Sequence, residues 1–435
     1  MVTDLDNVLA TAAQARRLAP PPGDPRYQRY CAELGRLLVQ EWDAVSAANA
    51  EDLARAEAAG LPAELLDRLS VSKRHLDALV ELTAEVGRAL PVVTRSGEPR
   101  QAGNGMTVRR LPKPLGVLLM IYEARPTVTV EGTLLPVSVG NVAILRGGSE
   151  TAATNAAFGA IAARAAAAAG LPDGMVQVLT EVDRAGVRTL LGRHDAIDVL
   201  IPRGSPTLIE FCQRSSTIPV LASGGGVNHL YVDRSADPRL AAELALDSKL
   251  YEPTACNTVQ LVLAHSDIAA ELVGAMVAAG RAAGLTWAVR VDPRLAAEDG
   301  DGFGRLDSDL VTVTELAPHD LGREFLDRSL GVLVVSDPAE AIGHVHRYGS
   351  RHTEGIVATD PAVIEQFLGA VDAAALVVNG SMRLHDGRTM SLGPELSIGT
   401  GRLHVRGPVG LSALLTYSWV IEGNGAVRGL PEATS

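Results

Sequence analysis

The sequence predicts an α/β protein built on parallel sheets that helices cover on both faces. Apolar runs such as 116–122, "GVLLMIY", and 331–336, "GVLVVS", lack alternating polar residues, which is typical of strands buried on both faces. These runs alternate along the chain with longer segments of helical periodicity. The length of 435 residues favours two or three domains. In such sheets, we expect ligands outside the carboxyl ends of the strands.

The chain is predicted to be helical up to about residue 90. Apolar residues recur at steps of three and four over 29–60, and Gly60 ends this pattern. After Pro91 the pattern changes. A turn at Asn104 and Gly105 leads into the alternating stretch 106–111, "MTVRRL", which predicts an exposed ribbon strand.

Two series of strands and helices follow. In the first series, we predict strands at 116–122, 141–148, 175–180, 196–204 and 217–226, and helices at 127–140, 149–170, 183–192 and 205–214. In the second series, we predict strands at 228–233, 258–265, 331–336 and 354–360, and helices at 235–248 and 266–284.

Two further segments differ from this pattern. Residues 414–429 alternate and contain an Asn-Gly turn, so we expect strands there that can join the sheet of another subunit. The Asp- and Gly-containing region 293–323 is predicted to be a mobile surface loop.

Composition excludes several classes of protein. The net charge of −12 and a pI near 5.4 disfavour nucleic acid and anionic membrane surfaces as partners. The amino-terminal residues lack the apolar core of a secretory signal, and the Ala-rich stretch 149–170 is interpreted as a packed helix rather than a membrane span. Three widely spaced cysteines match neither a disulfide framework nor a zinc site, so we expect a cytoplasmic protein without a metal.

Cys256 is the candidate nucleophile. It lies in a predicted helix-to-strand loop, between the polar residues Thr254 and Asn257, and loops on a rigid scaffold are where reactive groups concentrate. An isolated cysteine is more often a small buried apolar residue, and that alternative stays open for Cys256. Cys31 and Cys212 lie within helical patterns, so we interpret both as structural.

A family resemblance bears on this choice. In order along the chain, the motifs are "PLGVLLMIYEARPTVTVEG", "NVAILRGGSE", "VLIPRG", "EPTACNTVQLVLAH", "YGSRHTEGIVATD" and "LHVRGPVGL". Together they resemble gamma-glutamyl phosphate reductase, or glutamate-5-semialdehyde dehydrogenase, a family of the aldehyde dehydrogenase superfamily. The resemblance implies an aldehyde dehydrogenase-like α/β fold with two parallel-sheet domains and a β-ribbon oligomerisation element. The implied parts are an NADP-binding domain at 1–98, 113–234 and 365–385, a catalytic domain at 235–364, and the oligomerisation element at 99–112 and 386–435.

The resemblance also implies a reaction. L-Glutamyl 5-phosphate would acylate Cys256 and release phosphate, and NADPH would then reduce the thioester to L-glutamate 5-semialdehyde, a step towards proline. The backbone N–H of Cys256 and the side chain of Asn257 are the candidates for stabilising the negative charge on the carbonyl oxygen.

Further site residues are candidates by resemblance and by position at strand ends. The motifs at three strand ends can meet the cofactor, with Arg146 placed to pair with a 2′-phosphate, and Glu324 resembles the glutamate that holds the nicotinamide ribose. The predicted cofactor-binding residues are Glu123, Arg125, Pro126, Arg146, Ser149, Glu150, Arg203, Gly204, Gly224 and Glu324. The predicted substrate-binding residues are Lys249, His352, Thr353 and Arg406.

Two departures from the family bear on the substrate. Ala222 and Gln260 stand where the family has acids, so a paralogue that reduces a modified or carrier-linked glutamyl phosphate is an alternative. A catalytically inactive scaffold is a second alternative, against which the intact Cys256 argues. We expect a small-molecule acyl phosphate as substrate, a homo-oligomer, and a glutamate kinase as a possible partner.

Overall fold

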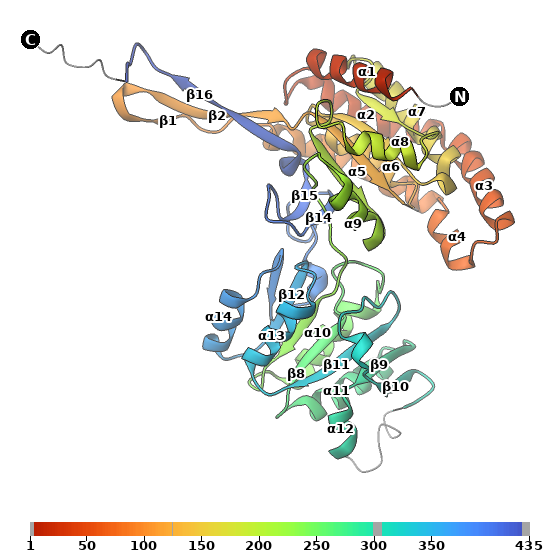
Figure 1. Cartoon of the computed structure of the whole chain (residues 1–435), viewed down its shortest axis with the longest axis vertical. Coiled ribbons are helices and arrows are strands. Elements are labelled where there is room, and N and C mark those ends of the chain that lie inside the picture. Colours follow the sequence, from red (N-terminus) through yellow and green to blue (C-terminus); the bar gives the residue numbers. More distant parts are fainter. Residues whose placement is uncertain (1–3, 124, 299–306, 429–435) are drawn as a thin grey trace, which may run out of the picture. The chain divides into compact units, whose positions relative to one another are not determined.

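The chain forms two compact α/β units. The computed structural model describes residues 4–123, 125–298 and 307–428 (Figure 1). The first unit takes 1–221, 393–397 and 409–435, and the second takes 222–392 and 398–408. No helix among the described residues is long and apolar enough to cross a lipid bilayer.

A four-stranded parallel sheet in the order β5-β4-β3-β6 forms the centre of the first unit. Its middle strand β3 is apolar and buried along its whole length, as the sequence predicts. Because the strands are parallel, the loops that follow β3, β4 and β6 leave the same edge of the sheet. The strands are β3 (Val117–Tyr122), β4 (Val142–Arg146), β5 (Val176–Val178) and β6 (Val199–Arg203).

Helices cover this sheet in layers. Helices α6 and α7 pack directly on the strands, and α2, α3 and α5 pack on these two helices. Helix α6 is buried on almost every side, which explains why its sequence is apolar all round. The helices are α1 (Leu5–Leu18), α2 (Pro25–Gln40), α3 (Trp42–Ala58), α4 (Ala63–Leu69), α5 (Lys73–Val93), α6 (Val128–Ser138), α7 (Ala152–Ala168), α8 (Arg184–Leu191) and α9 (Pro206–Ser215).

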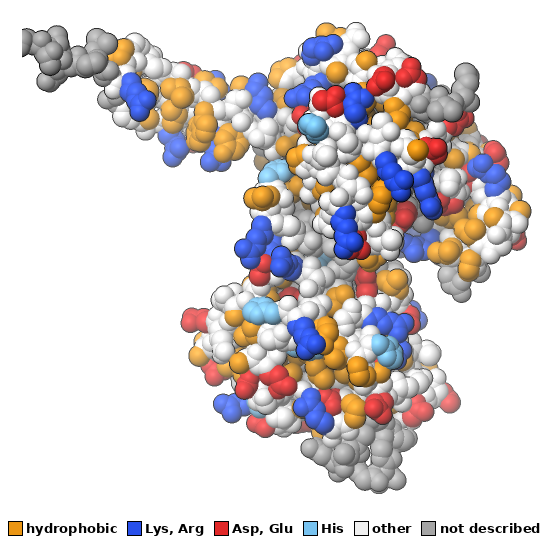
Figure 2. All heavy atoms as spheres, viewed as in Figure 1, with side chains coloured by type: hydrophobic (Ala, Val, Ile, Leu, Met, Phe, Trp, Pro, Cys, Tyr) orange, Lys and Arg blue, Asp and Glu red, His pale blue; other side chains and the backbone are white. Residues whose placement is uncertain are grey.

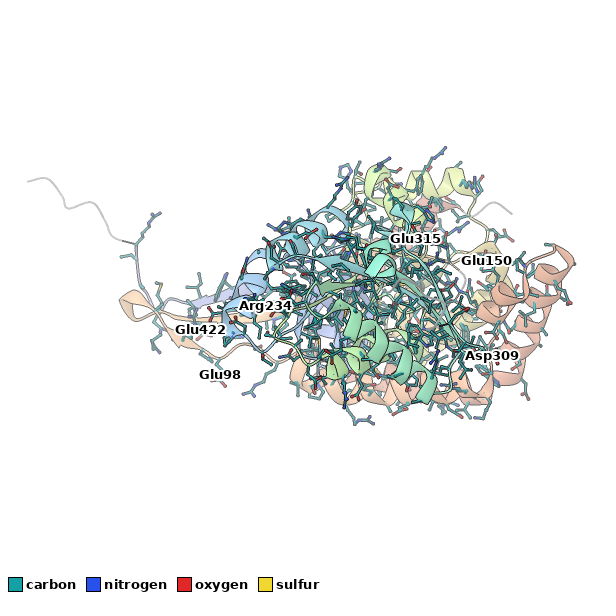
Figure 3. The ribbon with its side chains drawn as sticks, turned by 90° about the horizontal axis from the view of Figure 1, so that it is seen from below. Glu98, Glu150, Arg234, Asp309, Glu315 and Glu422 are labelled. Atoms are coloured by element: carbon teal, nitrogen blue, oxygen red, sulfur yellow. The ribbon has the colours of Figure 1, made fainter. Side chains whose placement is uncertain are left out.

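An antiparallel ribbon belongs to the same unit. Strand β2 (Thr107–Pro114) pairs with β1 (Arg100–Gln101) on one side and with β16 (Leu415–Glu422) on the other. Arg110 lies over the rings of Tyr417 and Trp419, with its Cζ 4.5 and 5.2 Å from their centroids. Glu422, labelled in Figure 3, ends β16 beside Arg109. Figure 2 shows apolar and basic side chains together along this ribbon.

A seven-stranded sheet forms the second unit, and every pairing in it is parallel. Its order is β10-β9-β11-β8-β7-β12-β13. The strands are β7 (His229–Val232), β8 (Leu261–His265), β9 (Trp287–Val291), β10 (Val311–Glu315), β11 (Ser329–Val335), β12 (Thr353–Val357) and β13 (Ala375–Val378). A separate two-stranded sheet joins β14 (Glu395–Gly399) and β15 (Gly407–Gly410).

The two faces of the large sheet carry two separate hydrophobic cores. Leu230 and Val232 of β7 point into the core under α10 and α11, whereas Tyr231 between them points into the core under α13 and α14. Successive side chains of a strand point to opposite faces, so a strand buried on both sides must be apolar at every position. The prediction of helices on both faces is confirmed for this sheet.

The helices of the second unit begin at clear sequence signals. Asp237, Asp337 and Asp360 each precede a proline and accept a hydrogen bond from a backbone N–H of the first turn. This combination supplies the cap and the proline that favour a helix start. The helices are α10 (Pro238–Leu250), α11 (Ala269–Ala282), α12 (Pro293–Glu298), α13 (Pro338–Tyr348) and α14 (Pro361–Ala370).

Three expectations about the elements need correction. The predicted strand at 217–226 forms only an isolated bridge between Val220 and Leu200. The region 293–323 is not a loop throughout, because it contains α12 and β10, while 299–306 lie outside the described residues. Residues 365–385, which we grouped with the cofactor domain, supply β13 to the sheet of the second unit.

Candidate active site

Cys256 differs from the other two cysteines in its exposure. It lies in the loop 251–260 between α10 and β8 and is exposed, whereas Cys31 and Cys212 are buried. Burial raises the pKa of both buried thiols to about 11, so neither supplies a thiolate near neutral pH. Exposure therefore singles out the cysteine that the sequence indicates as the nucleophile.

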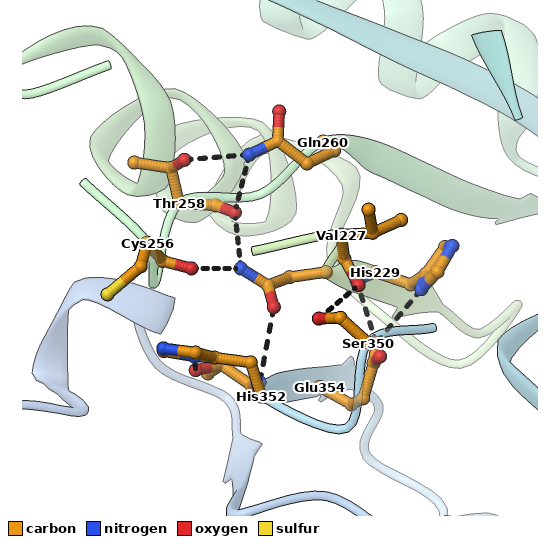
Figure 4. A network of polar contacts seen from close by, with 10 residues as sticks. Val227, His229, Cys256, Thr258, Gln260, Ser350, His352 and Glu354 are labelled. Carbon is orange, nitrogen blue, oxygen red and sulfur yellow. Dashed lines mark hydrogen bonds and ion pairs between the residues drawn. The ribbon is translucent and has the colours of Figure 1, made fainter. Parts of the chain in front are cut away.

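The backbone of Cys256 is held by the segment before β7. Asn228 Nδ2 donates to the carbonyl oxygens of Cys256 and Thr258, each at 2.8 Å (Figure 4). Gly226 approaches so closely that a Cβ there would lie 1.9 Å from the carbonyl oxygen of Cys256. The N–H of Gly226 in turn donates to Glu324 Oε1 at 3.0 Å. Glu324, predicted to bind the cofactor, thus lies beside the segment that supports the nucleophile.

The same segment contains two other residues singled out in the sequence. Gly224 lies against Thr400, whose Oγ1 would be 3.1 Å from an added Cβ. The carbonyl oxygen of Ala222 accepts a hydrogen bond from the N–H of Thr400 at 3.2 Å. Small residues at 222 and 224 therefore fit the close approach of the 400 region.

The candidate residues of the second unit gather at the amino-terminal edge of its sheet. Cys256 precedes β8, Asn228 precedes β7, Glu324 precedes β11 and His352 precedes β12. These strands are parallel, so the segments before them lie at one edge. The rule that places ligands at the carboxyl ends does not describe this unit, because here the helix-to-strand loops carry the reactive side chains.

Asn257 is held by the segment 383–385. Its Nδ2 donates to the carbonyl oxygen of His385 at 3.0 Å and, more weakly, to that of Arg383 at 3.5 Å. Its Oδ1 accepts a hydrogen bond from the Arg383 guanidinium, which also pairs with Glu252. In this arrangement, the amide of Asn257 fixes the loop to a distant segment, and its predicted role in stabilising an oxyanion stays a prediction.

Two buried histidines meet at one hydroxyl group. Nδ1 of His352 lies 2.7 Å from Thr353 Oγ1, and Nδ1 of His385 lies 2.8 Å from the same oxygen. Burial lowers the pKa of His352 to about 3 and that of His385 to about 4, so both are neutral at physiological pH. The N–H of Thr353 donates to Asn228 Oδ1, which connects the pair to the residue that holds Cys256.

Lys249 has protein acceptors around its ammonium group. Nζ donates to Gln260 Oε1 at 2.9 Å and to the carbonyl oxygens of Phe325 and Pro253. Burial lowers its pKa to about 8. Gln260 Oε1 also accepts the N–H of Phe325 at 2.9 Å, and its Nε2 donates to Thr258 Oγ1 at 2.9 Å, a bond that an ionised carboxylate at position 260 could not make. Substrate binding by Lys249 stays a prediction.

Arg406 presents an incompletely paired guanidinium. Its Nη1 donates to Asp372 Oδ1 at 2.6 Å, and Arg402 binds the same carboxylate. These two cations lower the pKa of Asp372 to about 2. The Nε and Nη2 atoms of Arg406 are buried and find no acceptor among the described residues. Two such donors suit a carboxylate or phosphate group.

The remaining predicted residues follow the strands of the first unit. Glu123 Oε2 accepts the N–H of Ser205 at 2.8 Å and lies against Gly204, where an added Cβ would be 2.4 Å away. Arg203 faces Glu131 across 3.6 Å. Carbonyl oxygens of Arg125 and Pro126 accept hydrogen bonds from the first turn of α6, and Ser149 and Glu150 form a 3₁₀ turn after β4.

Arg146 ends β4 and donates through Nη2 to the carbonyl oxygen of Val182 at 3.1 Å. Glu150, labelled in Figure 3, packs its carboxylate over Gly148, where a Cβ would be 2.1 Å away. The sheet edge thus combines arginines, which suit phosphates, with carboxylates, which suit ribose hydroxyl groups. This set of side chains fits a dinucleotide.

Comparison with known proteins decides the family. The aldehyde dehydrogenase family model matches residues 9–290. A gamma-glutamyl phosphate reductase of Sorangium cellulosum is 38% identical over 98% of this chain and 99% of its own length. The enzyme of that name from Moorella thermoacetica is 36% identical over 96% and 97%. The chain belongs to the gamma-glutamyl phosphate reductase family, within the aldehyde dehydrogenases.

Solved structures agree with this membership. The crystal structure of gamma-glutamyl phosphate reductase from Thermotoga maritima is 29% identical, covers 98% of this chain and 100% of its own, and superposes with a TM-score of 0.90. An acetylating aldehyde dehydrogenase from Geobacillus thermoglucosidasius shares the fold, with a TM-score of 0.70 at 19% identity, over 99% of this chain and 98% of its own. The aldehyde dehydrogenase-like fold class is confirmed, and family membership makes the chain an oxidoreductase with a nicotinamide cofactor.

Three residues of the reductase site were not anticipated. Asn228, Arg383 and His385 surround the Cys256 loop, yet two of them lie more than 120 residues beyond it. The only available signal was weak, since Asn228 is a polar residue directly before an apolar strand and His385 lies in a polar stretch. Their proximity to Cys256 depends on the strand order, which no local pattern provides.

Proposed function

We propose that this reductase converts L-glutamyl 5-phosphate into L-glutamate 5-semialdehyde and phosphate through a thioester on Cys256. The observation that carries the proposal is the exposed Cys256, whose carbonyl is fixed by Asn228 while the other two cysteines are buried. The relatives that cover almost the whole chain bear the name of this activity. No observation favours a modified glutamyl group or an inactive scaffold.

Acylation of the thiol is the first step. The thiolate of Cys256 attacks the acyl carbon, a carbon–sulfur bond forms, and the bond to the phosphate oxygen breaks. Negative charge then develops on the carbonyl oxygen, and a positioned N–H donor stabilises it. The backbone N–H of Cys256 is our first candidate for this donor. The side chain of Asn257 is the second, although it would first have to leave the His385 carbonyl.

The cofactor supplies the hydride that reduces the thioester. We assign it to the sheet edge of the first unit, where Arg146 and Arg203 suit its phosphates and Glu123 suits a ribose hydroxyl group. Nε and Nη2 of Arg146 both donate to the carbonyl oxygen of Val182, and the remaining guanidinium N–H groups can donate to a 2′-phosphate, so we infer a preference for NADP. Around these residues, we expect Arg125, Pro126, Ser149, Glu150 and Gly204 to complete the site. For Gly224 and Glu324, which belong to the second unit, cofactor binding stays a prediction from the family resemblance.

The substrate carries negative charge at both ends, so the site needs donors. We propose that the substrate carboxylate binds Arg406, whose Nε and Nη2 have no acceptor among the described residues. We assign the departing phosphate to His352, with Thr353 as its hydrogen-bond partner. Lys249 would contribute its positive charge from the interior rather than by direct contact, because its hydrogen bonds are engaged.

We further infer assembly and location from the ribbon and the charge. Tyr417, Trp419 and Ile421 lie on one face of β16, an edge strand, and are exposed. An exposed apolar edge of this kind invites pairing, so we propose that the ribbon joins subunits of a homo-oligomer. A cytoplasmic location and cooperation with a glutamate kinase remain proposals from the sequence.

Replacement of the thiol tests the proposed mechanism. Cys256→Ser should bind the nicotinamide cofactor normally and lose turnover by roughly 10³-fold or more, because the hydroxyl is a poor nucleophile at neutral pH. Cys31→Ser is the matched control, since it changes a buried thiol of α2 whose partner is Ser138, away from all the residues assigned to the site. Turnover of Cys256→Ser near that of the unmodified protein would remove the covalent mechanism.

A further inference from the structure

The hydrogen bonds around Thr353 fix opposite proton positions on the two buried histidines. The hydroxyl group of Thr353 has one proton, and its only hydrogen-bond partners among the described residues are the Nδ1 atoms of His352 and His385, so it donates to one of them and accepts an N–H from the other. Each neutral imidazole carries a single proton on nitrogen. One ring therefore has its proton at Nε2, and the other ring has a lone pair at Nε2.

Both outer nitrogens lack partners. The rings of His352 and His385 are 0% and 2% exposed, and neither Nε2 finds a hydrogen-bond partner among the described residues. Leaving a buried donor or acceptor unpaired is unfavourable, so a fully satisfied network would be expected in a purely structural pair. In this pair, the two Nδ1 atoms share Thr353 Oγ1, whereas the two Nε2 atoms have no partner among the described residues.

The two ends lie beside different parts of the candidate site. Asn228 bonds both the Cys256 carbonyl and the N–H of Thr353, and the labelled His352 and Cys256 flank this network in Figure 4. His385 Nε2 would lie 3.7 Å from a Cβ at Gly407, next to Arg406. One end of the pair thus adjoins the nucleophile loop, and the other adjoins the segment assigned to the substrate carboxylate.

The proposed reaction needs one proton beside the nucleophile loop, where the phosphate leaves. When the thiolate attacks an acyl phosphate dianion, the phosphate would leave as the trianion unless the oxygen of the breaking bond gains a proton. A lone neutral histidine cannot supply that proton without becoming an imidazolate. A histidine that receives a second proton at the same moment can do so.

We propose that His352, Thr353 and His385 form a proton relay to the departing phosphate, in which His385 acts through Thr353 and His352. The inference rests on the proposed function. As the carbon–oxygen bond breaks, His352 Nε2–H passes its proton to the phosphate oxygen, and Thr353 passes its hydroxyl proton to His352 Nδ1. His385 Nδ1–H re-protonates Thr353, and a water molecule gives a proton to His385 Nε2 and leaves as hydroxide to the solvent. Both rings remain neutral throughout.

The reverse reaction separates the relay from the rest of the chemistry. With semialdehyde and oxidised cofactor, a burst of reduced cofactor reports thiol addition and hydride removal, which need no relay. With added phosphate, steady turnover reports attack on the thioester, in which phosphate loses its proton through the same three groups. One kinetic trace therefore yields both quantities from the same folded molecules, so partial loss of folded protein does not affect their ratio.

The relay predicts a selective loss. In His385→Gln and Thr353→Val, phosphate-dependent turnover should fall about 10²-fold relative to the burst, as for loss of a general acid. Thr353→Ser restores the hydroxyl group and should recover most of the turnover lost in Thr353→Val. His346→Gln, a change at an exposed histidine of the same unit, should leave the ratio unaltered.

Two results would overturn the relay. An unchanged ratio in Thr353→Val and His385→Gln would show that phosphate obtains its proton elsewhere. Equal loss of burst and turnover, without recovery in Thr353→Ser, would assign the pair to structure alone. A missing burst in the unmodified protein would contradict the proposed function itself, and the relay with it.

Discussion

Lys249 carries its ammonium group in the protein interior, between Gln260 and the carbonyl oxygens of Phe325 and Pro253. A buried cation is tolerated only when such acceptors replace its hydration. The nearby Glu324 and Asp327 oppose the lowering of its pKa that burial causes. Lys249 therefore ties the end of α10 to the segment that precedes β11.

Removal of this ammonium group should destabilise the protein. In Lys249→Met, Gln260 Oε1 and the carbonyl oxygen of Phe325 lose a donor, and we expect a loss of about 2–4 kcal/mol in the free energy of unfolding. Urea denaturation measures it. Lys73→Met, at an exposed lysine, should change stability by about 0.5 kcal/mol or less. Equal stability of both variants would refute the structural role of Lys249.

At the scale of single residues, the sequence could indicate a functional residue where its immediate neighbours along the chain are informative. Cys256 stands between polar neighbours in a predicted loop, and this context indicated a reactive thiol. His385 and Arg383 gave no comparable signal, because their function depends on contacts with Asn257 and Thr353 across long stretches of chain.

At the scale of elements, the support of the nucleophile loop depends on one glycine. Gly226 contacts the Cys256 carbonyl and donates its N–H to Glu324. The backbone at this position approaches another backbone so closely that no side chain fits between them. The loop 251–260 and the segment before β7 therefore form one packed unit.

A methyl group at this glycine should displace the nucleophile loop. Gly226→Ala should cost about 1–3 kcal/mol of stability by overpacking, and turnover should fall roughly tenfold or more as Cys256 moves. Gly274→Ala in α11 is the matched control, because a Cβ there meets open space. It should leave turnover unchanged and add about 0.5–1 kcal/mol of stability. Normal turnover in Gly226→Ala would argue against this packing.

Strands and helices with strong signals could be predicted, and those with mixed signals could not. β3 is apolar throughout, and β4, β8 and β11 are apolar except for one terminal residue each, so these strands stand out from their surroundings. β10 at the sheet edge is partly exposed and polar, which made it resemble a loop. The apolar run 217–226 misled in the other direction, since Ile218 and Leu221 are buried without joining a strand ladder.

At the scale of the whole molecule, two buried histidines, His352 and His385, and the half-buried His344 link stability to pH. Burial lowers the pKa of His344 and His385 to about 4 and that of His352 to about 3, against 6.5 for an exposed histidine. Between pH 6.5 and 4, the unfolded chain binds protons at these positions and the folded chain does not. Their contribution is therefore complete above pH 6.5 and is lost as the pH falls.

The free energy of unfolding should therefore decrease from pH 6.5 towards pH 4, by up to about 1.4 kcal/mol per pH unit for each histidine. Glu354 acts in the opposite sense, because burial raises its pKa and its contribution is lost as the pH rises. Denaturation at a series of pH values measures the slope. His344→Asn should reduce it, whereas the exposed His346→Gln should not. A flat profile between pH 6.5 and 5 would contradict the prediction.

The division into two units could be predicted only in part from the sequence. The two series of strands and helices correspond to the two sheets, but the chain returns to each unit after residue 390. Such returns leave no mark in local periodicity. Residues 365–385 were grouped with the cofactor domain on the family resemblance, whereas they lie in the continuous segment 222–392 of the second unit and contain β13, which pairs with β12.

The most direct test of the account is to trap the acyl enzyme. The unmodified protein is mixed with L-glutamyl 5-phosphate in the absence of reduced cofactor, quenched in acid, digested and analysed by mass spectrometry. We expect one glutamyl group on the peptide that contains Cys256, and none on the peptides of Cys31 and Cys212 or in Cys256→Ser. Stoichiometric release of phosphate with no adduct on Cys256 would contradict the thioester mechanism.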